Sequence, residues 1–138
     1  MTTLPSNAQL TSDIRRVLPD AIAAWLYGSA GSGSMNMDSD IDIAVLLPPT
    51  DTRKTSWLLR TQTQALAEHW HRKVDLVNFS VVSCVLQKEI LSGGKLLFST
   101  DDFIAGNAEL QALSQYRDFN ERNAKEFERI ARTGKVYA

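Results

Sequence analysis

Three aspartates are the residues of this chain best suited to chemistry, because each accompanies an apolar run with the character of a β-strand. Asp40 and Asp42 flank Ile41 at the start of one such run, and Asp75 lies inside a second. Side chains two residues apart on a strand project from the same face, so Asp40 and Asp42 should point together. If the strand of Asp75 lies beside the first strand, three carboxylates meet at one edge of a sheet.

Clustered carboxylates repel one another and need cations, and oxygen ligands of this kind select hard ions such as Mg²⁺ or Mn²⁺. Two such ions can hold a triphosphate, activate an attacking hydroxyl and stabilise a leaving pyrophosphate. Gly28 and Ser29 end a short apolar run, where backbone N–H groups and a hydroxyl can approach phosphate oxygens. Taken singly, these residues also suit an ordinary turn, a solvated strand edge and, for Asp75, a buried ion pair.

Hydrophobic periodicity and turn residues predict the elements that must position these groups. The predicted helices span residues 7–18, 51–71, 81–91 and about 102–132, and the predicted strands span 21–27, 41–47, 74–79 and 95–98, with a loop over 30–39. This order predicts an α/β (α+β) fold in which helices flank a small mixed sheet.

Two further expectations concern apolar side chains. The C-terminal helix is expected to use Leu110, Leu113, Phe127 and Ile130 as its apolar stripe. Trp57 and Trp70 are expected to pack against other side chains rather than to stack on an adenine.

Composition limits the classes of protein that fit. A chain of 138 residues with 43% apolar and 22% charged residues suits one globular domain over 1–138, with a catalytic core at about 21–79. A net charge of −1 favours neither direct nucleic-acid binding nor an anionic membrane. Cys84 is the sole cysteine, which excludes an internal disulfide. No membrane-spanning run or signal peptide is recognisable, so a cytoplasmic protein is expected.

Two rival phosphate or metal motifs fail on particular residues. Gly28 and Gly33 have the spacing of a P-loop, but Ser34 occupies the position of the phosphate-binding lysine. The aspartates near residue 40 imitate a calcium loop, but Ile43 and Pro49 stand where that loop requires a glycine and a glutamate. Both interpretations are therefore excluded.

The full pattern resembles the nucleotidyltransferase superfamily of DNA polymerase beta, in its short form, the minimal nucleotidyltransferase. The shared signature is Gly-Ser, about ten residues, Asp-x-Asp and a third Asp on a later strand, and it covers roughly 21–79. The resemblance implies that Asp40, Asp42 and Asp75 are the catalytic, metal-binding residues, with Asp40 and Asp42 as ligands of both metals and Asp75 completing the site near the attacking hydroxyl. The nucleotide-binding residues that it implies are Gly28, Ser29, Gly33 and Ser39.

The sequence departs from many relatives in the turn that follows the first strand. Those relatives carry arginines there, whereas this chain has Ala30 and Ser32. Compensation for the triphosphate charge is then expected from the metals or from basic residues elsewhere. The candidates, which the sequence does not rank, are Arg53, Lys54, Lys88 and Lys95.

Minimal members of this family commonly occur beside a helical HEPN ribonuclease as a toxin–antitoxin pair. The resemblance thus implies an antitoxin and protein adenylyltransferase that transfers AMP from ATP to a tyrosine of its HEPN toxin and inactivates it. Two Mg²⁺ ions, or Mn²⁺ in their place, would serve as cofactors, and a hetero-oligomer with the toxin is expected. About sixty residues follow Asp75, which leaves little room for a separate acceptor-binding domain.

Two alternatives from other classes stay open. One is a nucleotidyltransferase that acts on a small molecule such as an aminoglycoside, and the other is a non-catalytic antitoxin that neutralises by binding. In either kind of antitoxin, the charged C-terminal helix is expected to help hold the toxin. Its expected apolar contacts are Tyr116, Phe119 and Phe127.

Overall fold

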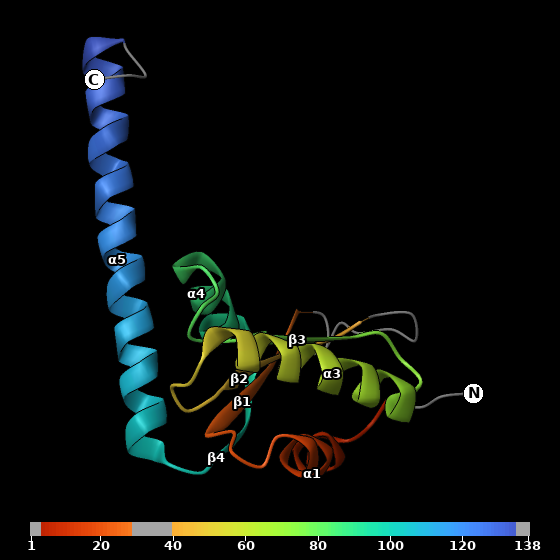
Figure 1. Ribbon diagram of the computed structural model, residues 1–138. Coiled ribbons are helices and arrows are strands. Elements are labelled where there is room, and N and C mark those ends of the chain that lie inside the picture. Colours follow the sequence, from red (N-terminus) through yellow and green to blue (C-terminus); the bar gives the residue numbers. More distant parts are fainter. Residues whose placement is uncertain (1–3, 29–39, 135–138) are drawn as a thin grey trace.

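The computed structural model describes residues 4–28 and 40–134. In chain order, the elements are α1 (Asn7–Val17), β1 (Ala23–Tyr27), β2 (Ile41–Leu46), α3 (Thr52–Trp70), β3 (Val74–Asn78), α4 (Cys84–Gly93), β4 (Lys95–Ser99) and α5 (Asp102–Thr133). Their order is the predicted one, and the predicted α/β class with a mixed sheet and flanking helices is confirmed (Figure 1).

The sheet has four strands in the order β3-β2-β1-β4. β1 pairs antiparallel with both β2 and β4, whereas β2 and β3 run parallel. A parallel pair needs a crossover connection, and α3 provides it. β3 therefore lies at one edge of the sheet, and within the described ranges no strand pairs with its outer side.

Alternation along the strands divides the core between the two faces of the sheet. Ile41 and Ile43 face a cluster beneath α1 and α3 that includes Ile14 and Leu66. The opposite face, with Trp25 stacked on Phe79 at 4.5 Å between ring centroids, packs beneath α4 and the start of α5. Since Ile41 and Ile43 are buried on the first face, the neighbouring aspartates project from the second.

Polar caps fix where the helices begin. Ser6, Asp51, Ser83 and Asp101 each accept a hydrogen bond from a backbone N–H in the first turn of the following helix. The start of α4 at residue 84 corrects the predicted start at residue 81. The reason is local, since Ser83 Oγ accepts the N–H of Leu86 at 3.2 Å and so sets the first turn.

The predicted apolar stripe of α5 is wrong. Its buried residues are Ala105 and Ala112, whereas Leu110, Leu113 and Phe127 are exposed. The first half of α5 lies beside α4 and buries only the side that carries Ala105 and Ala112, whereas its C-terminal half extends past the rest of the molecule (Figure 1). Apolar side chains along that half are therefore left uncovered by the other helices and strands that the structure describes.

The tryptophans also differ from expectation. Trp70 is buried, and its Nε1 donates to Asp13 Oδ2 at 2.8 Å, as packing requires. Trp57 is 66% exposed, so the expectation that it packs is wrong. Among the helices of the described residues, none combines the length and the apolar composition that a membrane span requires.

Candidate active site

Strand pairing brings the predicted carboxylates together. Asp42 and Asp75 are direct partners in the parallel register of β2 and β3. Asp40 stands immediately before β2, two residues from Asp42, and so lies on the same face. The sheet thus places all three side chains at one end of two adjacent strands, on the face that α4 and α5 partly cover.

The pKa of Asp42 reflects its burial and the charges of the neighbouring carboxylates. Burial, followed by the charges of Asp75 and Asp40, raises the pKa of the Asp42 carboxyl, and Lys73 lowers it. Lys73 Nζ lies 3.9 Å from Asp40 Oδ2, but both side chains are largely exposed, so this ion pair contributes little. The site therefore concentrates negative charge that favours a bound cation.

Gly28 occupies the tightest position in the site. It adopts φ +66°, a left-handed conformation that side chains rarely take. A Cβ built on it would lie 2.6 Å from Asp42 Oδ2. Glycine is therefore needed both for the turn and for the space that the carboxylate occupies. The other predicted nucleotide-binding residues, Ser29, Gly33 and Ser39, lie outside the described residues.

Sequence reasoning missed Tyr27. This residue is the register partner of Asp42 across β1 and β2, and it shares the face of the carboxylates. Burial, followed by the charges of Asp42 and Asp75, raises the pKa of the Tyr27 phenol to about 12. The phenol thus stays protonated at neutral pH, as a donor. Its position just before Gly28 was visible in the sequence, but the antiparallel register that places it beside Asp42 was not.

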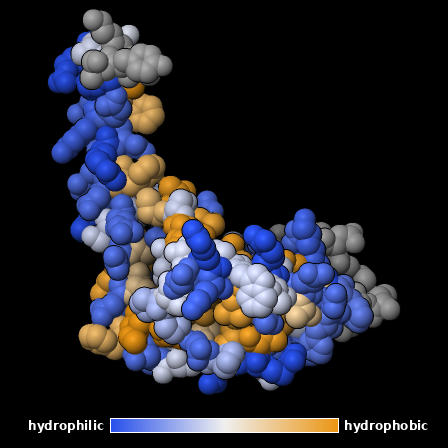
Figure 2. Space-filling model, viewed as in Figure 1, coloured by the Kyte–Doolittle hydropathy of each residue, from blue (hydrophilic) through white to orange (hydrophobic). Residues whose placement is uncertain are grey.

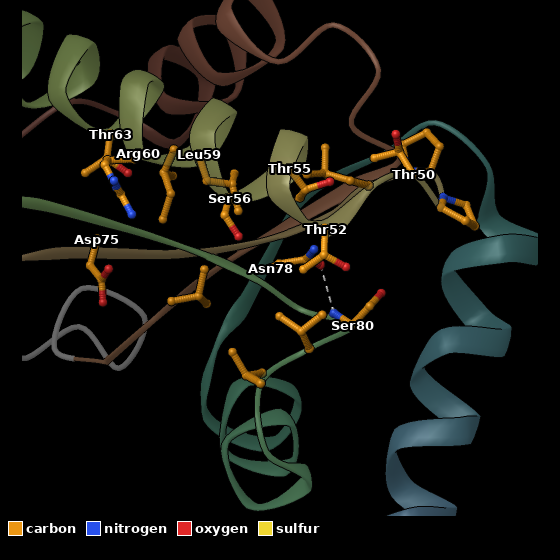
Figure 3. A pocket seen from close by; sticks show the side chains of 17 residues that line it. Thr50, Thr52, Thr55, Ser56, Leu59, Arg60, Thr63, Asp75, Asn78 and Ser80 are labelled. Carbon is orange, nitrogen blue, oxygen red and sulfur yellow. Dashed lines mark hydrogen bonds between the residues drawn. The ribbon is translucent and has the colours of Figure 1, made fainter.

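A cavity of about 620 Å³ adjoins the carboxylates along the edge of β3. Asp75 lines one end of it, and Arg60 and Thr63 of α3 lie across from that aspartate (Figure 3). The other end is formed by Thr50 and Thr52 where α3 begins. The candidate catalytic edge therefore opens into a groove large enough for part of a substrate.

The basic residues near the aspartates are not the ones that the sequence suggested. Lys73 and Arg60 were not among those candidates. Lys73 lies 3.9 Å from Asp40, and Arg60 lines the same cavity as Asp75 (Figure 3). Lys88 instead places its Nζ 5.6 Å from the centre of the Tyr116 ring. The residues of a separate surface hollow are Arg53, Lys54, Trp57 and Leu58.

The donor set suits a hard divalent cation. Across the part of the chain that the structure describes, no three His, Cys, Asp or Glu side chains already surround one metal-binding point. Asp40, Asp42 and Asp75 nevertheless offer oxygen ligands with excess negative charge, and a cation would relieve the repulsion that raises the pKa of Asp42. These three residues would hold the metal.

Comparison with known proteins agrees with this geometry. A Shewanella oneidensis protein named protein adenylyltransferase MntA is 36% identical over 87 residues, which are 63% of this chain and 60% of that protein. The chain thus aligns with less than two thirds of that relative's length.

Solved structures share the fold. One, a toxin–antitoxin crystal structure with AMP-PNP, has a TM-score of 0.75 at 25% identity and covers 92% of this chain and 99% of its own. Another is a tri-AMPylated Shewanella oneidensis HEPN toxin in complex with MNT antitoxin, with a TM-score of 0.70 at 24% identity over 91% and 95% of the two chains.

The family described as "Polymerase beta, Nucleotidyltransferase" matches residues 11–103, a range that contains all three aspartates and the strands that carry them. The chain therefore belongs to the polymerase beta nucleotidyltransferase family.

Proposed function

We propose that this chain is an antitoxin that transfers AMP from ATP to a tyrosine of a HEPN ribonuclease toxin and thereby inactivates it. The observation that carries the proposal is the register pairing of Asp42 with Asp75, with Asp40 on the same face. The relative named protein adenylyltransferase MntA supports the protein acceptor, and the toxin–antitoxin structure with AMP-PNP supports both the partner and ATP.

The reaction is an in-line displacement at the α-phosphorus of ATP. The tyrosine oxygen forms the new bond to phosphorus, the bond to the bridging oxygen of the β-phosphate breaks, and pyrophosphate leaves with that electron pair. Asp75 is exposed and is the one of the three aspartates that lines the cavity, so we assign it to meet the acceptor hydroxyl and receive its proton.

Asp40 and Asp42, together with Asp75, would hold two Mg²⁺ ions, which when bound neutralise the triphosphate and stabilise the leaving group. Around them, Gly28 keeps the turn clear of Asp42. The protonated phenol of Tyr27 lies beside the same carboxylates and can donate to them, which fixes their orientation. The triphosphate is expected along Gly28, Ser29, Gly33 and Ser39.

The exposed half of α5 is the surface that we assign to the toxin. Phe127 is 73% exposed there, and apolar side chains appear on this projecting helix in Figure 2. Tyr116 and Phe119, named with it from the sequence, are half-buried. A helical partner can cover an apolar face of this kind.

The docking surface is tested with a matched pair of variants. Phe127→Glu should weaken toxin binding at least about tenfold, because a charge would be buried at the interface. Ser114→Glu adds the same charge at another exposed position of α5 and should bind like the parent. Equal binding by the two variants in calorimetry would show that the toxin docks elsewhere.

Transfer itself is tested with ATP radiolabelled at the α-phosphate, Mg²⁺ and three acceptors: the HEPN toxin encoded beside this chain, an aminoglycoside, and none. Label on the toxin alone is the expected result. Label on the aminoglycoside would favour the small-molecule enzyme, whereas neutralisation of the toxin without label would favour an antitoxin that acts by binding. The cytoplasmic location stays a prediction.

A further inference from the structure

The outer edge of β3 presents backbone groups that no other described strand pairs with. Lys73 C=O accepts from Ile41 N–H, and Phe79 N–H donates to Val45 C=O, each at 2.9 Å. In a parallel pair, every second residue directs both its N–H and its C=O group to the same neighbouring strand. The backbone groups of the odd-numbered residues of β3 therefore point to β2. The residues that direct their groups outward are Val74, Leu76 and Asn78.

This edge forms one wall of the 620 Å³ cavity, and α3 forms the other. Four of the five polar residues of α3 that line the cavity are spaced three or four residues apart, which places them on one side of the helix. They are Thr52, Ser56, Arg60 and Thr63. This side of α3 carries hydroxyls, one guanidinium and Leu59, so the cavity offers polar groups beside a largely apolar lining (Figure 3).

The groove is continuous with the candidate active site. It runs along β3 from Asp75 and Thr63 at one end to Asn78 and Thr52 at the other. Four successive β3 residues line it, which corresponds to a strand segment of roughly 13 Å. A strand paired with the edge of β3 would therefore place one of its side chains next to Asp75, on the sheet face that α4 and α5 partly cover.

We propose that this groove binds the acceptor as an extended polypeptide segment, which adds to the sheet as a strand beside β3 and delivers its hydroxyl to Asp75. The inference rests on the proposed function, because it specifies how the acceptor of that reaction is held. The outward N–H and C=O groups of Leu76 and the outward N–H of Asn78 form the ladder. The hydroxyls of α3 and Arg60 contact the segment from the opposite side.

The choice of a polypeptide follows from the kind of groups exposed. A strand edge supplies donors and acceptors at regular intervals, which match the backbone of another chain rather than a compact small molecule. Backbone pairing also holds a segment of almost any sequence, so that the position of the hydroxyl, and not its neighbours, decides which residue is modified. The groove then selects an acceptor segment by its extended conformation rather than by its sequence.

Two substitutions on α3 distinguish the effect of blocking the groove from the effect of placing a tryptophan elsewhere on the helix. Ser56→Trp fills the cavity from an exposed position, whereas Thr61→Trp places the same side chain at an exposed position outside the cavity lining. Ser56→Trp should slow AMP transfer to the toxin at least about tenfold, with unchanged ATP–Mg²⁺ affinity by calorimetry. Thr61→Trp should match the parent in both measurements.

Amide exchange gives a second readout that needs no transfer. In the complex with the HEPN toxin and an ATP analogue whose α,β-bridging oxygen is replaced by a methylene group, the N–H groups of Leu76 and Asn78 should exchange at least about tenfold more slowly than in the free chain. Normal transfer by Ser56→Trp together with unprotected amides overturns the groove proposal but leaves the proposed function standing. Protected amides in a complex that never transfers AMP support the groove and refute the proposed function.

Discussion

Replacing Gly28 by alanine tests how closely the turn approaches the Asp42 carboxylate. The backbone at Gly28 is left-handed, so alanine costs about 1–2 kcal/mol there before any contact is considered. The added Cβ would also lie 2.6 Å from Asp42 Oδ2, whereas ordinary contact begins at 3.4 Å. The carboxylate must therefore retreat by about 0.8 Å, a displacement that can cost roughly 100-fold in rate.

Gly134→Ala is the matched control, because Gly134 has φ +69° and no atom of the described residues within 4 Å of the position that a Cβ would take. It carries the same backbone cost without a nearby carboxylate. Single-turnover transfer of AMP to the toxin, followed by intact-mass spectrometry, should be about 100-fold slower for Gly28→Ala and unchanged for Gly134→Ala. Parent-like transfer by Gly28→Ala would refute the claim that this turn sets the position of Asp42.

Three further predictions follow from the carboxylate cluster. Asp75→Asn should lose transfer yet still bind ATP–Mg²⁺ in calorimetry, whereas Asp40→Asn should lose both; equal loss of binding would contradict this division. The pKa of Asp42 is raised in the folded state, so binding of a proton by this carboxyl stabilises the folded chain. This contribution to stability is fully present below about pH 4, and it is lost as the pH rises through the folded pKa. As the pH rises from 4 to 7, the melting temperature of the metal-free parent should therefore change less favourably than that of Asp42→Asn, and an identical pH dependence would count against the clustering. One tyrosine should titrate near pH 12 in ultraviolet absorbance, and Mg²⁺ should lower the midpoint of that titration. If the same transition persists in Tyr27→Phe, it belongs to another tyrosine.

The sequence was sufficient for the order of elements and for the meeting of the three aspartates. Alternation along an apolar strand requires Asp40 and Asp42 to share a face, and the crossover through α3 makes β2 and β3 parallel neighbours. The cluster was therefore predictable without coordinates. The start of α3 was predictable to within one residue at Asp51, whereas the start of α4 was predicted three residues early although Ser83 caps it.

Features that depend on tertiary placement were not predictable. The position of Tyr27 beside Asp42 depends on the antiparallel register of β1 and β2, which the sequence does not state. The groove beside β3 depends on how far α3 stands from the strand edge. The exposure of Phe127 depends on α5 extending past α4, so a stripe that suggested a core instead faces outward.

The measurement that tests the central claim most directly is the mass of the HEPN toxin after co-expression with either the parent chain or Asp42→Asn. Asp42 is the register partner of Asp75, so its loss should reduce transfer by several orders of magnitude. The toxin should gain one or more increments of AMP with the parent and none with a folded Asp42→Asn. A toxin that carries the same AMP increments with both chains would contradict catalysis by this carboxylate cluster.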